Sequence, residues 1–525
     1  MLFNSYIFIF LFFPLCITGF YALTMWEKPD IAKAWLIGFS LWFYGYFSPS
    51  YLLIMIISIV SNYALTRVIR KHPNTKAPLT VGVIFNLSLL GFFKYLDFMI
   101  SNLNFVLGTQ IPLKNILLPL GISFFTFQQI GYLADVYKEC KEEVCIECKD
   151  NGTGKSDRFI DYALFVSFFP QLVAGPIVTK KEMFPQFATL SGRRPDAEKI
   201  GRGLTLFILG LSKKVLIADA FGRAVDIGYS SIATLGRLDS FLVMIWYTMQ
   251  LYFDFSGYCD MARGLAGMLG FELPVNFDSP YKASDIVDFW HRWHKTLTAF
   301  FTKYVYFPLG GSRKGTVRTI INILIVYFLS GLWHGAGWNF VFWGMLHGVA
   351  YAVVRTIKRR SEAGNIKELT GLNGENRQKI KSKYNLLQRL SRIVSHTATF
   401  LYVSFAWVFF RASSITEGWA LIKNMFTGTS TGINYALADA FARIDELWYI
   451  VKFSGLPNVN FPLAHNLVMI LFTLCALIVV FAAPNAAEIS GKIRPRVSGA
   501  ICIGLVGIWC VLSLSEVSTF LYFNF

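Results

Sequence analysis

The clearest chemical signal in this sequence is an ionisable side chain inside an uncharged stretch. Residues 319–354 contain no Asp, Glu, Lys or Arg, yet His334 lies there among three glycines. An ionisable group deep in an apolar stretch indicates a functional site by default, and broken backbone at that depth must face protein or a water-filled cavity. Because an imidazole exchanges a proton near neutral pH, His334 is a candidate general base. A histidine satisfied by a neighbouring helix is the structural alternative.

Two further histidines lie upstream. His291 and His294 are three residues apart, which puts both rings on one face of a helix. Zinc needs three or four ligands and a third is not evident, so we predict that no metal is bound. The open interpretations are a structural pair at the membrane interface, or a catalytic or substrate-orienting role for at least one ring.

A glycine-rich basic turn, Pro-Leu-Gly-Gly-Ser-Arg-Lys-Gly, occupies residues 308–315. Backbone N–H groups at Gly310 and Gly311, together with the cations of Arg313 and Lys314, are suited to phosphate binding. The segment matches no P-loop, and a plain surface turn is the alternative. We predict these four residues as a binding site for an anionic, phosphate-bearing ligand at the cytoplasmic face.

Two acids, Asp254 and Asp260, stand in an apolar context. Either can orient a histidine or line a polar cavity, and an ion pair with a nearby arginine such as Arg263 is the alternative. Residues 428–432 match the G-x-S-x-G pattern of a nucleophile elbow. That motif requires a strand before it and a helix after it, so in a polar loop we interpret it as a coincidence.

Three cysteines, Cys140, Cys145 and Cys148, have the spacing C-x4-C-x2-C in a polar segment. No nearby residue completes a tetrahedral zinc set. We therefore favour an incidental or redox-labile loop over a metal site.

The composition shows what must position these residues. Of 525 residues, 54% are hydrophobic, 17% aromatic and only 15% charged. Soluble domains carry about 25% charge, so the sequence predicts an all-α polytopic membrane protein. The net charge of +17 fits basic cytoplasmic loops and contacts with anionic lipids rather than nucleic acid.

The hydrophobic pattern predicts about eleven to thirteen membrane-crossing or re-entrant helices. Residues 1–26 carry no charge and lack the features of a cleaved signal, so we expect an uncleaved first span. The uncharged stretch 34–66 is too long for one straight crossing, and Pro49 offers a break. Further apolar stretches lie at about 79–100, 116–133, 162–178, 203–221, 240–258, 319–354, 396–410, 466–483 and 498–514.

Basic segments set the expected orientation and organisation. Residues 355–392 hold eleven Lys or Arg against three Glu, which predicts a cytoplasmic location. We expect a membrane core at 1–354 with its catalytic region at 250–354, a basic cytoplasmic loop at 355–395, and C-terminal membrane helices at 396–525.

The sequence resembles the membrane-bound O-acyltransferases, and within them the membrane subunits of bacterial alginate and peptidoglycan O-acetylation. The resemblance spans most of the chain. The matching segments are LPLGISFFTFQ (118–128), FFPQLVAGP (168–176), YFDFSGY (252–258), FWHRWH (289–294), PLGG (308–311), SGLWHG (330–335) and FLYFNF (520–525).

Carried over residue by residue, the two characteristic histidines of the family fall on His294 and His334. The branch has Arg at the place of His291, so no role is transferred to that residue. The three-cysteine segment and the long basic segment 355–392 lie outside the family pattern.

The resemblance implies helices around a funnel or tunnel with His334 near its narrow point, in a bacterial inner membrane. It implies that cytoplasmic acetyl-coenzyme A is the acyl donor, a substrate rather than a permanently bound cofactor. His334 would act as general base, and His294 would position the acceptor or stabilise the oxyanion. The acceptor would be an extracytoplasmic polysaccharide, reached directly or through a secreted partner of the SGNH-hydrolase type.

Two other functions stay open at this stage. One is D-alanyl transfer to teichoic acid, in which a carrier protein presents the acyl group. The other is a transporter that uses His334 as a proton relay.

Overall fold

The computed structural model describes residues 1–142, 157–369, 385–429, 432–442, 444–492, 497–514 and 519–521. Within these ranges the regular structure is helical, and no strand is found. The predicted all-α class is therefore confirmed. The chain divides into two compact units: Met1–Val215 with Phe255–Val275 and Ala486–Phe525, and Leu216–Asp254 with Asn276–Asn485.

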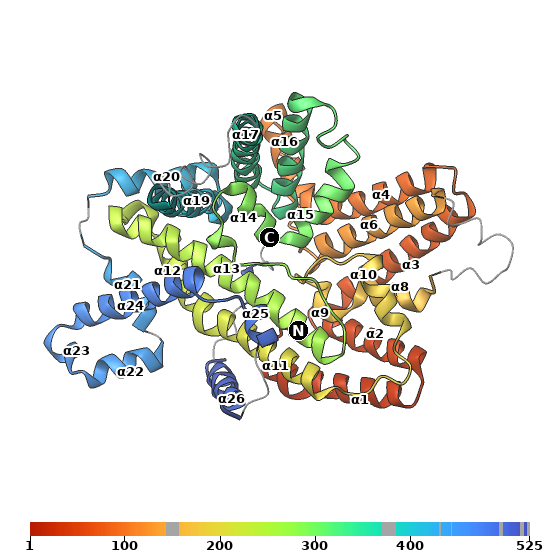
Figure 1. Ribbon diagram of the computed structural model, residues 1–525, viewed down its shortest axis with the longest axis horizontal. Helices are drawn as coiled ribbons and strands as arrows, with labels where there is room; N and C mark the ends of the chain where they lie inside the picture. Colours follow the sequence, from red (N-terminus) through yellow and green to blue (C-terminus); the bar gives the residue numbers. More distant parts are fainter. Residues whose placement is uncertain are drawn as a thin grey trace. The chain divides into compact units, whose positions relative to one another are not determined.

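The first unit is built mainly from the N-terminal helices, coloured red to yellow in Figure 1. It also contains the C-terminal half of the long helix α13 (Arg237–Met268). Its other helices are α1 (Phe13–Met25), α2 (Pro29–Gly45), α3 (Pro49–Lys71), α4 (Ala77–Leu90), α5 (Leu96–Leu107), α6 (Ile122–Lys141), α8 (Phe159–Ser167), α9 (Phe169–Leu172), α10 (Lys180–Ala188), α11 (Ala197–Ser212), α25 (Ala486–Lys492) and α26 (Val497–Leu512).

The predicted break in the stretch 34–66 is confirmed. Helix α2 ends at Gly45 and α3 begins at Pro49. Proline suits the first turn of a helix because its missing N–H would have no partner there. Buried amides then join α3 to α4: Asn86 donates to Asn62 Oδ1 at 2.6 Å. Such bonds between helices satisfy polar side chains where water is absent.

The second unit holds the candidate site. Besides the N-terminal half of α13, it contains α12 (Asp219–Ser230), α14 (Ile286–Arg292), α15 (Lys295–Phe301), α16 (Gly315–His334), α17 (Trp338–Leu369), α19 (Asn385–Arg411), α20 (Ile415–Thr427), α21 (Tyr435–Ala442), α22 (Asp445–Phe453), α23 (Leu456–Val459) and α24 (Phe461–Ala482). A π-helical turn, Thr302–Tyr306, directly follows α15. Shorter helical turns at Ile232–Thr234 and Pro280–Lys282 complete it.

Helices α16 and α17 pack directly against each other (Figure 1) because glycines bring their backbones together. A Cβ on Gly331 would lie 2.5 Å from the carbonyl oxygen of Phe340, and one on Gly344 would lie 2.4 Å from that of Tyr327. Real Cβ atoms do not approach so closely, so both positions require glycine. Small residues at a helix crossing are typical of membrane proteins.

Seven helices in the described part of the chain are long and apolar enough to cross a membrane. Their bounds are Phe8–Met25, Pro49–Lys71, Ala77–Leu107, Gly315–His334, Trp338–Arg359, Arg392–Arg411 and Phe461–Ala482. The protein is therefore a multi-pass membrane protein. Whether shorter helices bring the crossings to eleven or more stays a prediction.

The sequence pattern predicted a basic loop at residues 355–395, but the described ends of this segment are helical. Helix α17 continues to Leu369 and α19 begins at Asn385, so both ends of residues 355–395 are helical. Lysine and arginine are good helix formers, and a span can continue past the membrane as a polar helix. The cytoplasmic location and the sequence-based domain boundaries stay predictions.

Candidate active site

His334 is the last residue of α16 and is 4% exposed. The predicted break follows it: α17 begins at Trp338. Gly335 makes the break possible, because a Cβ there would lie 2.1 Å from the ring of Phe340. The imidazole packs perpendicular to the ring of Trp343, with centroids 5.0 Å apart, and against Phe410 at 5.2 Å. The position of the His334 ring is therefore set by the end of α16 and by its contacts with Trp343 and Phe410.

His294 lies between α14, which ends at Arg292, and α15, and it is fully buried. The expectation that His291 and His294 share one helix face is therefore wrong, because the helix ends between them and His291 is exposed. Its backbone has φ +44°, in the left-handed region. For a residue with a side chain this conformation costs about 1–3 kcal/mol and is common at functional sites. The rings of His294 and His334 both contact Trp333, at centroid distances of 6.0 and 4.8 Å. The structure thus brings the two predicted histidines against one indole.

Asn276 selects the tautomer of His294. Its Oδ1 lies 3.1 Å from Nδ1 of His294 and accepts from the backbone N–H of Thr296 at 3.2 Å. Because Oδ1 is an acceptor, Nδ1 of His294 carries the proton and Nε2 carries the lone pair. Burial lowers the pKa of His294 to about 3, so the ring is neutral at physiological pH.

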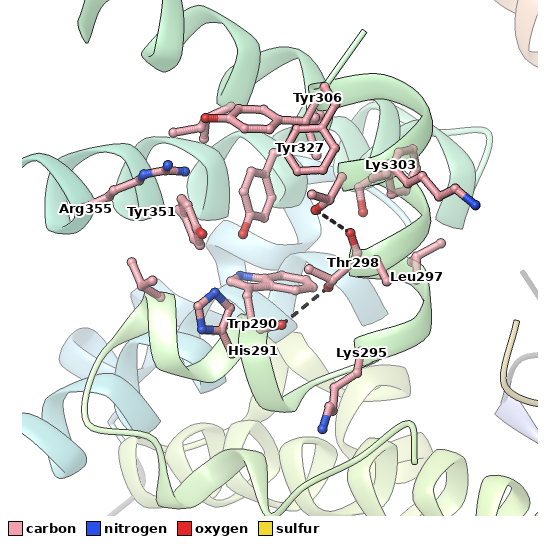
Figure 2. A pocket seen from close by; sticks show the side chains of 18 of the residues that line it. Trp290, His291, Lys295, Leu297, Thr298, Lys303, Tyr306, Tyr327, Tyr351 and Arg355 are labelled. Atoms are coloured by element: carbon pink, nitrogen blue, oxygen red, sulfur yellow. Dashed lines mark hydrogen bonds between the residues drawn. The ribbon is translucent and has the colours of Figure 1, made fainter. Parts of the chain in front are cut away.

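A cavity of about 900 Å³ opens between α14, α15, α16 and α17. Figure 2 shows aromatic rings facing it, among them Trp290, Tyr327 and Tyr351. Ser330 also lines the cavity and lies four residues before His334 on α16. Residues at this spacing share one helix face. The cavity therefore extends to within one helical turn of His334.

The charges that line the cavity are basic. Lys295, Lys303 and Arg355 line it, and all lining residues belong to the described part of the chain and include no Asp or Glu. The π-helical turn contributes Lys303, and such turns are frequent at functional sites. His291 lines the cavity as well, from an exposed position on α14. The lining combines cations, hydroxyls and aromatic rings, which suits an anionic ligand with apolar parts.

Arg355 has neutral partners in the described structure. It donates to Ser312 Oγ at 2.8 Å, and its guanidinium lies 5.7 Å from the ring centre of Tyr306. Tyr306 and Ser312 are themselves joined through their hydroxyls at 2.8 Å. No carboxylate ion pair of Arg355 is found among the described residues. This arginine therefore keeps its positive charge available to a ligand.

The glycine-rich turn lies beside this group but differs from the expected phosphate cradle. The N–H of Gly310 donates to the carbonyl of Phe307, and that of Gly311 donates to the carbonyl of Tyr306, each at 2.9 Å. These N–H groups stabilise the turn. Arg313 and Lys314 are exposed and do not line the cavity, whereas Ser312, the residue before them, does. A donor role for these four residues stays a prediction.

His347 is a buried histidine that the sequence analysis did not select. It is 0% exposed, and its Nδ1 accepts the indole N–H of Trp290 at 3.4 Å. Its ring also packs against Trp343 at 5.1 Å. The signal was present in the sequence, because His347 and His334 share the same uncharged stretch.

The remaining candidates are placed as follows. Asp260 pairs with Lys213 at 2.6 Å rather than with Arg263, which donates instead to the carbonyl of Leu273. Lys213 begins the π-helical turn Lys213–Ala218, which follows α11. It lies 47 residues before Asp260 in the chain, so sequence proximity does not indicate this pair. Asp254 is buried.

Cys140 is buried, while Cys145 and Cys148 fall outside the described residues. Among the described residues no group of three or more His, Cys, Asp or Glu is arranged to hold a metal ion. Residues 430–431 of the G-x-S-x-G segment also lie outside the described ranges.

Comparison with known proteins identifies the class to which this fold and site belong. Residues 149–370 match the model of the MBOAT, membrane-bound O-acyltransferase family. A peptidoglycan O-acetyltransferase of Helicobacter pylori is 36% identical over 100% of this chain and 98% of its own length. A probable alginate O-acetylase AlgI of Pseudomonas aeruginosa is 35% identical over 81% of this chain and 75% of its own.

A teichoic acid D-alanyltransferase of Streptococcus thermophilus is more distant, with 27% identity over 45% of this chain and 56% of its own length. The chain belongs to the MBOAT family. It is an acyltransferase of the branch that contains the peptidoglycan and alginate O-acetylating proteins.

Proposed function

We propose that this chain transfers an acetyl group from acetyl-coenzyme A, bound from the cytoplasm, to a hydroxyl group that serves an extracytoplasmic polysaccharide. The observation that carries the proposal is the cation-lined cavity that extends to within one turn of His334. Acetyl-coenzyme A combines phosphates with an aromatic base and a flexible arm that ends in the thioester. Cations, aromatic rings and hydroxyls in one cavity match that combination.

His334 is proposed as the general base. The acceptor oxygen attacks the thioester carbonyl carbon while the imidazole takes the hydroxyl proton. The C–S bond then breaks, and the protonated imidazole returns its proton to the leaving thiolate. The imidazole has the aromatic neighbours Trp343 and Phe410, which exclude water from this exchange.

His294 is proposed to position the acceptor. Its tautomer, held by Asn276, presents a lone pair at Nε2, which can accept a hydrogen bond from a hydroxyl group. A neutral ring in this tautomer has no N–H at Nε2 to donate to an oxyanion. Acceptor positioning is therefore favoured over oxyanion stabilisation.

Peptidoglycan is the acceptor favoured by the relatives, because the peptidoglycan O-acetyltransferase aligns with the whole chain. An alginate-like exopolysaccharide is the second candidate, supported by the AlgI proteins. We further propose location in a bacterial inner membrane and a secreted SGNH-hydrolase-like partner that completes transfer to sugar. D-alanyl transfer is less supported, since that relative covers less than half of the chain. Membership of an acyltransferase family removes the transporter alternative.

The test is acetyl transfer by purified protein in lipid nanodiscs, with labelled acetyl-coenzyme A and soluble peptidoglycan or alginate fragments, with and without a secreted partner. Loss of a general base lowers the rate by about 10²–10⁴-fold. The rate of acetyl transfer by His334→Ala should therefore be at least about 10²-fold lower than that of the wild type. Equal yield and thermal stability of the variant are required, because a lost buried hydrogen bond can itself unfold the site. Near-normal transfer by folded His334→Ala would overturn the mechanism. If D-alanine were transferred from a carrier protein and no acetyl group from acetyl-coenzyme A, the proposal that acetyl-coenzyme A is the donor would be overturned.

A further inference from the structure

His347 lies in the second unit at the centre of a cage of aromatic rings. Its ring is stacked with Phe289 at 6.3 Å and perpendicular to Trp290 at 5.1 Å. Trp343, Trp407 and Tyr402 complete the cage, at 5.1, 5.9 and 6.1 Å. A leucine would fill such an apolar space without the cost of burying a polar ring. The presence of an imidazole therefore needs a reason beyond packing.

The hydrogen bond from Trp290 supplies that reason. An indole N–H is a donor only, so Nδ1 of His347 must be the acceptor. The neutral ring then carries its proton on Nε2, for which the described residues offer no hydrogen-bond partner. A buried N–H without a partner is destabilising, because its hydrogen bond to water is lost and not replaced. The structure thus retains a destabilising Nε2–H at His347, and with it an Nδ1 acceptor that is fixed toward Trp290.

Trp290 connects His347 to the cavity, because it donates to Nδ1 of His347 and also lines the cavity. Its ring forms part of the cavity wall (Figure 2) and packs edge-to-face against Tyr327 at 5.3 Å. Without the bond to His347, the indole could rotate about its side-chain bonds and change the shape of the wall. His347 also shares Trp343 with His334. One buried imidazole thus contacts both the cavity wall and a neighbour of the candidate base.

We propose that His347 is a positioning residue: its Nδ1 holds the indole of Trp290 in the orientation that shapes the donor cavity. The proposal rests on the proposed function only in the identity of the cavity's ligand. His347 itself does not line the cavity and does not touch the reacting atoms. Its effect is expected on donor binding more than on the chemical step.

Two variants of His347 separate the acceptor from the bulk of the side chain. His347→Asn keeps an acceptor oxygen close to the place of Nδ1, while His347→Leu keeps the volume and removes the acceptor. Loss of one neutral hydrogen bond corresponds to roughly 3- to 10-fold in an equilibrium constant. His347→Leu should therefore raise the KM for acetyl-coenzyme A by roughly 3- to 10-fold with a smaller change in kcat, and His347→Asn should restore most of it.

A double-mutant cycle tests whether the effect passes through the indole N–H. Trp290→Phe keeps an aromatic wall without a donor and should raise KM as His347→Leu does. In the Trp290→Phe background, His347→Leu should add little. Tyr402→Phe is the matched control, because it removes a hydrogen bond to the carbonyl of Leu346 on α17 without touching Trp290. Additive effects of the two variants, or an equal rise in KM for Tyr402→Phe, would overturn the proposal.

A second readout needs neither substrate nor activity. In protein labelled with 5-fluorotryptophan, the ¹⁹F signal of Trp290 is assigned by its loss in Trp290→Phe. His347→Leu should shift or broaden that signal, whereas His347→Asn and Tyr402→Phe should leave it near its original position. An unchanged signal in His347→Leu would overturn the proposal, even if acetyl-coenzyme A proved not to be the donor. A shifted signal with no acetyl transfer by the wild type would instead contradict the proposed function alone.

Discussion

Arg355 of α17 donates a hydrogen bond to Ser312 Oγ at 2.8 Å, at the wall of the cavity that extends toward His334. Ser312 stands next to Arg313, the arginine that the glycine-rich basic turn favoured, yet the cavity is lined by Ser312 and Arg355 and not by Arg313. The bond joins two residues 43 positions apart in the chain and holds a cation at the cavity wall. In the proposed function, this cation would bind a phosphate of the donor.

Replacement of Arg355 should weaken donor binding. Hydrogen bonds to charged groups contribute about 1.5–3 kcal/mol, so Arg355→Ala should raise the KM for acetyl-coenzyme A about tenfold or more, with a smaller effect on kcat. Steady-state kinetics in nanodiscs measure this. Arg313→Ala is the comparison variant: a donor site in the cavity predicts a change in KM of less than about twofold, because exposed charges contribute little, whereas a donor site in the glycine-rich turn predicts the larger rise in KM there. The reverse pattern would assign the donor to the turn at residues 308–315.

The tautomer of His294 can be tested through pH. Burial holds the pKa of His294 at about 3, so this ring stays neutral and causes no loss of activity between pH 5 and 8. In Asn276→Asp a carboxylate accepts from Nδ1 and raises the pKa of His294. Activity of that variant should fall as the pH drops through the raised pKa, because the protonated ring loses its lone pair at Nε2.

The measurement is kcat/KM across pH 5–8 for the wild type, Asn276→Asp and Asn276→Ala. The alanine variant removes the acceptor without adding charge, so its activity should be lower at every pH with no new acid limb. Superimposable profiles for wild type and Asn276→Asp would show that His294 does not act through Nε2.

The close crossing of α16 and α17 predicts a sharp difference between two glycines. Gly331→Ala puts a Cβ 2.5 Å from the backbone oxygen of Phe340, and overpacking of this kind costs about 1–3 kcal/mol. Gly38→Ala in α2 meets nothing within 4 Å and should be neutral or slightly stabilising. Thermal unfolding in detergent should show a lower Tm for Gly331→Ala alone; equal Tm values would exclude the tight crossing.

Topology is tested by cysteine labelling in intact cells. The basic excess in residues 355–392 predicts a cytoplasmic location. A single cysteine at position 377 should react with an impermeant maleimide only after permeabilisation. If α19 crosses the membrane, a cysteine at the exposed Phe426 of α20 should show the opposite pattern. Labelling of position 377 from outside intact cells would contradict the cytoplasmic location of this segment, and with it the proposed direction of acyl transfer across the membrane.

Much of the fold followed from local physics. Hydrophobicity and the scarcity of charge specified a helical membrane protein, and the breaks at Pro49 and after His334 followed from proline and glycine backbone chemistry. His334 stood out for the same local reason, since an ionisable ring in an uncharged stretch is costly wherever it lies. These properties depend on neighbouring residues in the chain, so the sequence by itself determined them.

The composition of the cavity and the orientation of the histidines depended on how helices pack. Asn276 selects the tautomer of His294 across 18 residues, and Trp290 meets His347 across 57. The glycine-rich basic turn favoured Arg313, but the packing of α17 against α16 places Arg355 at the cavity, which Arg313 does not line. A side chain's direction across such distances is set by interhelical packing, which no local pattern encodes. Only the tertiary structure could therefore decide which cations and which histidines share a site.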